Sequence, residues 1–278
     1  MNFCKMHGLK NDFIVIDNID NNIKLSYNQT AFLCDRKAGI GADGLILIRL
    51  SNTADITMDY YNCDGSIAQV CGNGLRCTAK YVYDNGIIKN NKLTIQSCDK
   101  IYNCEITKTD DKNKADLISV NMGKAEFDKS KIPVKTENES PLDIRLNIDG
   151  EEIKLSALAM PNPHAVIIVD NFDLRYIEKI GSSLQDNEMF PQKVNVNFVK
   201  INADDNVELI TYERGVGITQ ACGSGACATA AVLNKKSLCK NKINIKMPGG
   251  DMIIQISQDN DIIMTGQAAA VFRGEINL

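Results

Sequence analysis

The sequence has no tryptophan and only two histidines, His7 and His164. Eight phenylalanines and eight tyrosines are its only aromatic residues, which disfavours the stacking surfaces that bind single-stranded nucleic acids. No two cysteines have the Cys-x-x-Cys spacing typical of zinc ribbons and fingers. We therefore expect no metal site and no nucleic-acid partner.

Long apolar runs and an excess of positive charge are also missing. No apolar run approaches the roughly 18 residues of a membrane helix, which disfavours a membrane protein. The net charge is −4, so the chain has no general basic surface for nucleic acid. No basic stretch followed by an apolar one opens the sequence, and we expect no signal peptide. These features predict a cytoplasmic protein.

The length of 278 residues favours two domains of about 100–150 residues each. The ten cysteines are numerous, but the chain is long and lacks an export signal, so we expect mostly reduced thiols. Short runs rich in Ile and Val, separated by Gly, Asn and Asp, predict many strands. The expected strands are 13–17, 45–50, 56–61, 93–96, 117–121, 144–148, 153–158, 165–169, 196–200, 207–212, 243–246, 252–256 and 262–264.

Helices are expected to be fewer. One is expected over 30–37, one after Cys71 with Gly86 as its stop, and one after Cys222. The stretch 126–141 is expected to be a loop or linker, because it mixes charge, serine and two prolines.

An internal repeat with an offset of 151 residues organises the chain. Cys71 aligns with Cys222, and Asn62 falls on Glu213. The other aligned pairs are Asn11 with Asn162, Val15 with Val166, Gly44 with Asn195, Tyr61 with Tyr212, Gly72 with Gly223, Gly74 with Gly225, and Ala79 with Ala230. The repeat predicts an α+β fold of two pseudo-symmetric domains, each a mostly antiparallel sheet or barrel around a central helix. The expected domains are 1–117 plus 263–278, and 118–262.

Each half of the repeat places a cysteine where a helix begins, in Cys71-Gly-Asn-Gly and Cys222-Gly-Ser-Gly. The first N–H groups of a helix lack internal partners and favour anions, so both thiols are expected to have a lowered pKa. The same N–H groups can hold a carboxylate. One thiolate base and one thiol acid on opposite faces of a carbon would invert its stereochemistry. The remaining eight cysteines are expected to be packing residues.

These motifs resemble those of the diaminopimelate epimerase family over nearly the whole chain. The matching segments are 6–13 (MHGLKNDF), 39–44 (GIGADG), 62–66 (NCDGS), 71–77 (CGNGLRC), 120–123 (VNMG), 162–164 (NPH), Asn195, 212–215 (YERG), 221–228 (ACGSGACA) and 248–250 (PGG). The resemblance implies a cofactor-independent epimerase, without pyridoxal phosphate, that converts LL-2,6-diaminopimelate to the meso form. That reaction belongs to the synthesis of lysine and peptidoglycan precursors, and the family likeness also suggests a homodimer.

The resemblance also assigns site residues. It implies that Cys71 and Cys222 are the acid/base pair, and that His164 and Glu213 contact the substrate amino group and assist the thiols. The groups it implies for the α-carboxylate are the N–H groups of Gly72, Asn73, Gly223 and Ser224. Those it implies for the far end of the substrate are Asn11, Asn62, Asn162, Asn195 and Arg214. Two positions depart from the family pattern: Pro161 stands where glycine is usual, and Ile218 where many relatives carry glutamate.

Three other interpretations have some support in the sequence. The spacing Gly39-x-Gly41-x-x-Gly44 matches a dinucleotide fingerprint, but a helix is expected before it and a strand after it, the reverse of the required order. A proline or hydroxyproline racemase would share the two-cysteine logic, but Arg214 and the asparagines favour a substrate with a second charged end. A non-catalytic metal or redox protein is the most distant alternative.

Overall fold

The computed structural model describes residues 1–68, 70–138 and 140–277. It divides into two compact units. Unit 1 contains Met1–Asn121 and the residues from Thr265 onward, and unit 2 contains Met122–Met264. Strands and helices are mixed and most strand pairs are antiparallel, so the expected α+β class is confirmed. No helix among the described residues is both long and apolar enough to span a membrane.

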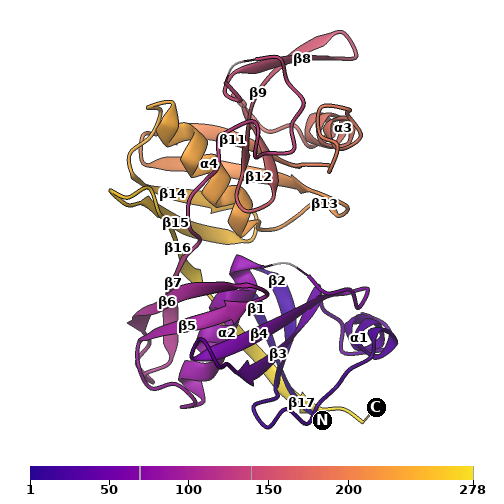
Figure 1. The fold of residues 1–278 in the computed structure, drawn as a ribbon, viewed down its shortest axis with the longest axis vertical. Helices are drawn as coiled ribbons and strands as arrows, with labels where there is room; N and C mark the ends of the chain where they lie inside the picture. The colour runs from indigo at the N-terminus through magenta and orange to yellow at the C-terminus, as the bar shows by residue number, and fades with distance from the viewer. Residues whose placement is uncertain (69, 139, 278) are drawn as a thin grey trace. The chain divides into compact units, whose positions relative to one another are not determined.

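Unit 1 wraps its strands around one helix (Figure 1). Its elements are β1 (Asn2–Gly8), β2 (Asn11–Asp17), α1 (Tyr27–Cys34), β3 (Gly44–Leu50), β4 (Ile56–Asn62), α2 (Gly72–Asp84), β5 (Lys92–Ser97), β6 (Lys100–Thr109), β7 (Ala115–Asn121) and β17 (Ala269–Glu275). Helix α2 contacts β1 to β7 and β17. Every α2 residue from Gly72 to Val82 is buried, as expected for a helix enclosed on all sides.

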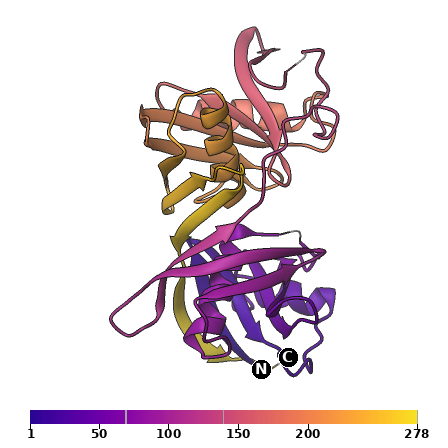
Figure 2. The ribbon, with the colours of Figure 1, turned by 60° about the vertical axis from the view of Figure 1, so that its left-hand side comes forward.

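The last strand of the chain completes unit 1. Strand β17 pairs antiparallel with β1, from Asn2 opposite Glu275 to His7 opposite Ala269. The amino group of Met1 donates to the carbonyl oxygen of Ile276 at 2.8 Å. Figure 2 shows this strand, in yellow, beside the indigo start of the chain.

Unit 2 repeats the plan. Its elements are β8 (Ile144–Ile148), β9 (Glu151–Ala159), β10 (Pro163–Ile168), α3 (Leu174–Gln185), β11 (Asn195–Ala203), β12 (Asn206–Glu213), β13 (Gly217–Ile218), α4 (Gly223–Lys235), β14 (Lys242–Met247), β15 (Gly250–Ile256) and the start of β16 (Ile262–Gln267). Helix α4 contacts β9, β10, β11 and β15. A large apolar cluster, which includes Phe198 and Leu184, packs between α3 and the strands.

The repeat is visible element by element. Helices α2 and α4 each span 13 residues and begin at Gly72 and Gly223, 151 positions apart. Strands β3 and β11 begin at Gly44 and Asn195, with the same offset. Each pairs parallel with the strand that carries the preceding motif, β2 in unit 1 and β10 in unit 2. The expectation of two similar halves is confirmed.

The observed helices differ from expectation at two places. Helix α1 begins at Tyr27 rather than Thr30, because Ser26 and Gln29 form a reciprocal capping box. It ends at Cys34 rather than Lys37, because the Asp35 side chain accepts from the N–H groups of the next turn. Helix α3 was not expected; Asp173 caps it, and its inward face is Ile177, Ile180 and Leu184.

Four strands were also missed: β1, β6, β13 and β17. Strand β6 has a mostly polar sequence without an apolar run. Strand β17 begins with the apolar run Ala-Ala-Val-Phe, so its signal was present in the sequence and was missed. The described part of 126–141 contains no helix or regular strand, as expected for a loop. The glycine motif at 39–44 lies after α1 and leads into β3, which confirms that its context is wrong for a dinucleotide.

Candidate active site

The first candidate cluster lies in unit 1, where the first residue of β2 contacts the N-terminus of α2. Cys71 is the N-cap residue of α2 and is half-buried. Its Sγ atom donates to Asn11 Oδ1 at 3.5 Å, and Asn73 Nδ2 donates to the same oxygen at 3.1 Å. We call Asn11, Cys71 and Asn73 the Cys71 cluster. The structure thus brings Asn11 next to two residues that lie 60 and 62 positions further along the chain.

A buried arginine that the sequence analysis did not single out supports this cluster. Arg76 is fully buried, and its Nη2 atom donates to Asn73 Oδ1 at 2.7 Å. Its Nε atom donates to the carbonyl oxygen of Gln267 at 3.3 Å. A Cβ atom at Gly8 would lie 3.1 Å from Arg76 Nη2, so the glycine there leaves room for the guanidinium. The glycine of the Met-His-Gly motif is therefore explained by the close approach of the Arg76 side chain.

Asn62 lies apart from these hydrogen bonds, at the end of β4. Its Nδ2 atom donates to Ser66 Oγ at 2.9 Å, and its backbone N–H donates to the Ser66 carbonyl at 2.8 Å. Asp64 Oδ1 accepts from the same Ser66 hydroxyl at 2.6 Å. The motif Asn-Cys-Asp-Gly-Ser thus forms a tight turn that fixes Asn62.

The second candidate cluster lies in unit 2. Cys222 is the N-cap residue of α4 and is only 4% exposed. Its Sγ atom lies 3.5 Å from Ser224 Oγ, and it also interacts with the carboxylate of Glu213. Burial, and then the negative charge of Glu213, raise the pKa of the Cys222 thiol well above its ordinary value. The expected lowering by the helix N-terminus is wrong for Cys222, because desolvation and a neighbouring carboxylate outweigh the helix N–H groups.

Glu213 ends β12, and Arg214 follows it. Thr219 Oγ1 donates to Glu213 Oε1 at 2.5 Å. The backbone N–H of Arg214 donates to Asn195 Oδ1 at 2.8 Å, and its Nη1 atom donates to the Gln192 carbonyl at 3.0 Å. The Arg214 side chain is exposed, so most of its guanidinium donors face solvent. Asn195 is nearly fully buried and holds the backbone of this turn.

His164 lies on β10 and is fully buried. Burial, and then the positive charge of Arg214, lower its pKa to about 3 against a hydrogen bond to the Met160 backbone, so the ring is neutral at ordinary pH. Asn197 Nδ2 donates to the Ala165 carbonyl and to His164 Nδ1, both at 3.1 Å. Since Nδ1 accepts, the proton resides on Nε2, which lies 3.0 Å from Asn162 Oδ1 and donates to it.

Asn197 is a second polar residue that the sequence analysis missed. It is fully buried, and its Oδ1 atom accepts from Thr211 Oγ1 at 3.0 Å. A Cβ atom at Gly225 would collide with Asn197 Oδ1, so this glycine lets α4 pass close to the amide. The sequence signal for Asn197 was its position as a polar residue between the apolar residues of β11, which indicates a buried polar group.

The four backbone groups expected to bind a carboxylate are Gly72, Asn73, Gly223 and Ser224. They are the first two residues of α2 and of α4. Their N–H groups belong to the first turn, where a helix has no internal acceptors for them. Each unit therefore carries helix N–H donors that can bind an anion next to a cysteine.

Comparison with known proteins identifies the family. A family model described as diaminopimelate epimerase matches residues 3–128 and 156–271. The chain belongs to the diaminopimelate epimerase family. The diaminopimelate epimerase of Caldanaerobacter subterraneus is 40% identical over 279 residues, covering 100% of both chains. That of Leptospira biflexa is 39% identical and covers 100% of this chain and 99% of its own. The resemblance stated from the motifs is confirmed.

Solved structures show the same fold at low identity. A hydroxyproline epimerase from Agrobacterium vitis has a TM-score of 0.72 and 14% identity, covering 99% of this chain and 90% of its own. A PhzF-family phenazine biosynthesis protein from Bacillus anthracis has a TM-score of 0.70 and 12% identity, covering 100% of this chain and 99% of its own. These two proteins therefore share the fold of this chain, although their sequences are only 12–14% identical to it.

The two departures from the family pattern lie in different surroundings. Pro161 is exposed in the turn before Asn162. Ile218 lies on β13 opposite Tyr212 and packs against the apolar cluster of unit 2. A glutamate at 218 would face that cluster, so isoleucine removes a charge and adds apolar contact there.

Proposed function

We propose that this chain is a diaminopimelate epimerase that converts LL-2,6-diaminopimelate to the meso form, in the synthesis of lysine and peptidoglycan precursors. The observation that carries the proposal is the match to the family over nearly the whole chain together with two cysteines at equivalent helix starts. Two equivalent thiols suit a reaction that removes a proton from one face of a carbon and returns one to the other.

Cys71 and Cys222 are the proposed acid/base pair. The raised pKa of Cys222 keeps its sulfur protonated, which suits the proton donor at the start of a cycle. Cys71 is half-buried and would act as the base in that cycle. In the reverse direction the two roles exchange. The α-proton leaves as the base takes it, and the acid supplies a new proton to the opposite face.

The α-carboxylate would lie against the N–H groups of Gly72, Asn73, Gly223 and Ser224. Those groups stabilise negative charge, which increases as the α-proton leaves. No further group is needed as an electron sink in this proposal, so it requires no cofactor.

The far end of the substrate would be bound by Asn11, Asn62, Asn162, Asn195 and Arg214. Arg214 suits a second carboxylate, because its planar fork offers two parallel donors. Glu213 would accept a hydrogen bond from the amino group at the reacting carbon, and its negative charge adds to burial in raising the pKa of Cys222. His164 is fully buried, so we place it as a positioning residue that acts through Asn162.

The test is α-proton exchange in heavy water, with LL-diaminopimelate, a reductant and no added cofactor. The expected result is deuterium incorporation together with the meso isomer. Proline is the control substrate: exchange into proline alone would assign the chain to the racemases that share this fold. Exchange into neither would contradict the proposal.

A homodimer is proposed from family membership alone. Light scattering in solution at several protein concentrations tests it. A mass near 30.6 kDa at all concentrations would contradict it.

A further inference from the structure

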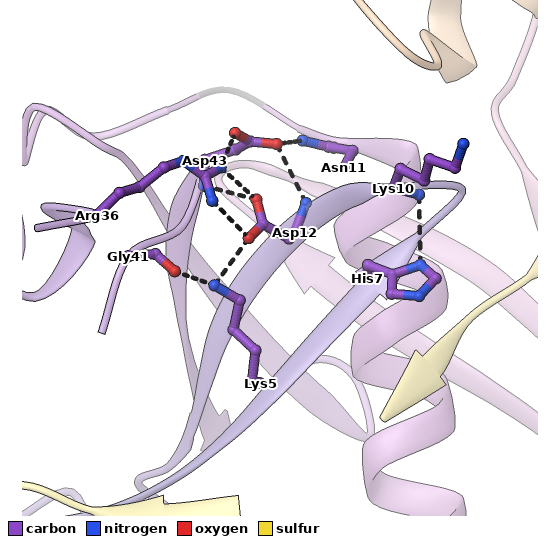
Figure 3. Close-up of polar contacts among 8 residues, drawn as sticks. All are labelled: Lys5, His7, Lys10, Asn11, Asp12, Arg36, Gly41 and Asp43. Atoms are coloured by element: carbon purple, nitrogen blue, oxygen red, sulfur yellow. Dashed lines mark hydrogen bonds and ion pairs between the residues drawn. The ribbon is translucent and has the colours of Figure 1, made fainter. Parts of the chain in front are cut away.

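A charged network surrounds Asn11 in unit 1, and the proposed reaction does not use it (Figure 3). Arg36 forms a two-pronged contact with Asp12, at 2.7 and 3.1 Å, and a 2.7 Å contact with Asp43. Lys5, which is buried, pairs with Asp12 at 2.7 Å and donates to the Gly41 carbonyl. Burial raises the pKa of Asp12, but hydrogen bonds from Arg36 and Lys5 outweigh it and hold that pKa below its usual range.

Asp43 connects this network to the Cys71 cluster. Its Oδ2 atom accepts from Asn11 Nδ2 at 2.9 Å and from the Asp12 backbone N–H at 3.1 Å. Its Oδ1 atom faces Arg36, so the carboxylate is fixed at both ends. In Figure 3 the carboxylate lies between the guanidinium and the amide, with one oxygen toward each.

A carboxylate can only accept hydrogen bonds, so it determines which end of an amide faces it. Asn11 must present its NH2 group to Asp43, and its carbonyl oxygen then faces the other way. That oxygen is the one that accepts from Cys71 Sγ and from Asn73. If the amide turned over, Nδ2 would face the sulfur instead.

We propose that Asp43 is a positioning residue that acts through Asn11 and keeps the amide oxygen, rather than the amide nitrogen, toward Cys71. The inference rests on the proposed function, because it assigns the thiol a role as a base. A thiolate beside an N–H donor is stabilised and is a weaker base, whereas beside a carbonyl oxygen it is not. The Asn11 orientation therefore preserves the basicity that removal of an α-proton requires.

The experiment is a double-mutant cycle on Asp43→Ala and Asn11→Ala, with two measurements. The first is alkylation of Cys71 by iodoacetamide as a function of pH, followed on its own peptide by mass spectrometry. The second is the kcat and KM of α-proton exchange from LL-diaminopimelate. Asp59→Ala is the matched control, because Asp59 forms a comparable two-pronged pair with Arg49 away from the cluster.

In Asp43→Ala, we expect the pH of half-maximal Cys71 alkylation to fall by about 0.7 unit, the effect of one hydrogen bond. We expect kcat to fall about fivefold, by the same reasoning, with a smaller change in KM. A more easily ionised thiol in a slower enzyme is a combination that general loosening does not produce. Asp43→Asn, which keeps an acceptor oxygen, should restore much of both values.

In the Asn11→Ala background, Asp43→Ala should change neither measurement. Equal effects in both backgrounds, or an effect equal to that of Asp59→Ala, would overturn the proposal. Should Asp43→Ala fail to fold, Arg36→Lys weakens the single Nη2 contact that holds Asp43 Oδ1 and must shift alkylation in the same direction. Absence of exchange in the wild type would overturn the proposed function alone, since the alkylation cycle does not need substrate.

Discussion

The two repeated halves share a backbone plan and differ in how they treat equivalent asparagines. In unit 1, Asn11 gives its NH2 group to Asp43 and its oxygen to Cys71. In unit 2, the side-chain oxygen of Asn162 accepts a hydrogen bond from His164 Nε2. The NH2 group of Asn162 is therefore the end of the amide that can contact other groups. A carboxylate in one half and a neutral imidazole in the other therefore orient the two amides in opposite senses.

The thiols differ in the same way. Cys71 is half-buried and faces an amide oxygen, while Cys222 is buried and faces a carboxylate. The repeat sets the position of each sulfur at a helix start, whereas burial and the polar neighbours of the sulfur differ between the two halves. A symmetric scaffold thus supports an asymmetric reaction, since the proposed chemistry inverts only one of the two ends of diaminopimelate in each cycle.

The assignment of one acid/base thiol to each half would fail if either thiol proved dispensable for activity. We expect Cys71→Ala and Cys222→Ala each to lower epimerisation by about 10²–10⁴-fold, because each removes a general acid or base. The measurement is formation of the meso isomer with deuterium incorporation. Cys77→Ala and Cys227→Ala are matched controls, since each is the second cysteine of its motif and is fully buried inside its helix. If one control lost activity as fully as its neighbour, the assignment would be wrong.

Arg214 sharpens the difference between the halves, because the equivalent position in unit 1 is Cys63. Arg214→Lys should raise KM about tenfold or more, since one ammonium cannot reproduce the two-pronged contact that we propose between Arg214 and a substrate carboxylate. The kcat should change less. Arg145→Lys, on an exposed pair with Glu152, serves as the control. Near-normal kinetics for Arg214→Lys would remove this residue from the site.

Glu213 is the charged neighbour that distinguishes Cys222 from Cys71. Glu213→Gln removes the negative charge that raises the pKa of Cys222, so the pH of half-maximal Cys222 alkylation should fall. It should remain above that of an exposed thiol, because burial is the larger cause of the raised pKa. Glu208→Gln, on the same strand, is the control. An unchanged Cys222 profile in Glu213→Gln would show that burial alone sets it.

The smallest expected effect is on stability, and it comes from the buried imidazole of His164. Its folded pKa of about 3 lies below the unfolded value of about 6.5, so the folded state binds fewer protons between them. The stabilisation is fully present above pH 6.5 and is lost as the pH falls toward 3. From pH 7 to pH 5 this group should cost roughly 2 kcal/mol of unfolding free energy.

His164→Gln should flatten that slope in urea unfolding. The comparison uses the difference between pH 7 and pH 5 in each protein, so the effect of the substitution itself cancels. Equal slopes in the two proteins would contradict the neutral, buried imidazole.

Much of this architecture could be predicted from the sequence, because the repeat is ungapped around the motifs. Helices α2 and α4 were expected from apolar residues at helical spacing after Cys71 and Cys222. Helix α3 was missed although the offset from α1 leads into it: residues 178–185 correspond to 27–34. Treating the halves as copies would have transferred the expected helix from unit 1 to unit 2.

The polar supports of the site were harder to predict. Arg76 and Asn197 are fully buried. From sequence alone, a charged or amide side chain is expected at the surface, because such side chains are rarely fully buried. The pKa of Cys222 was misjudged because helix position is visible in the sequence, whereas burial and contact with Glu213 require the folded chain. Asp43 stood inside a matching motif, but its link to Asn11 is a contact across 32 positions.

The pairing of β17 with β1 bears on how the chain is made. A ribosome releases the residues of unit 2 before it releases β17, so the unit that starts first is the last to be completed. Until then β1 lacks its partner from Asn2 to His7, and one edge of the unit 1 sheet stays open. During synthesis, the Cys71 half of the molecule is thus the half exposed to mispairing, and the final residues of the chain act as its closing step.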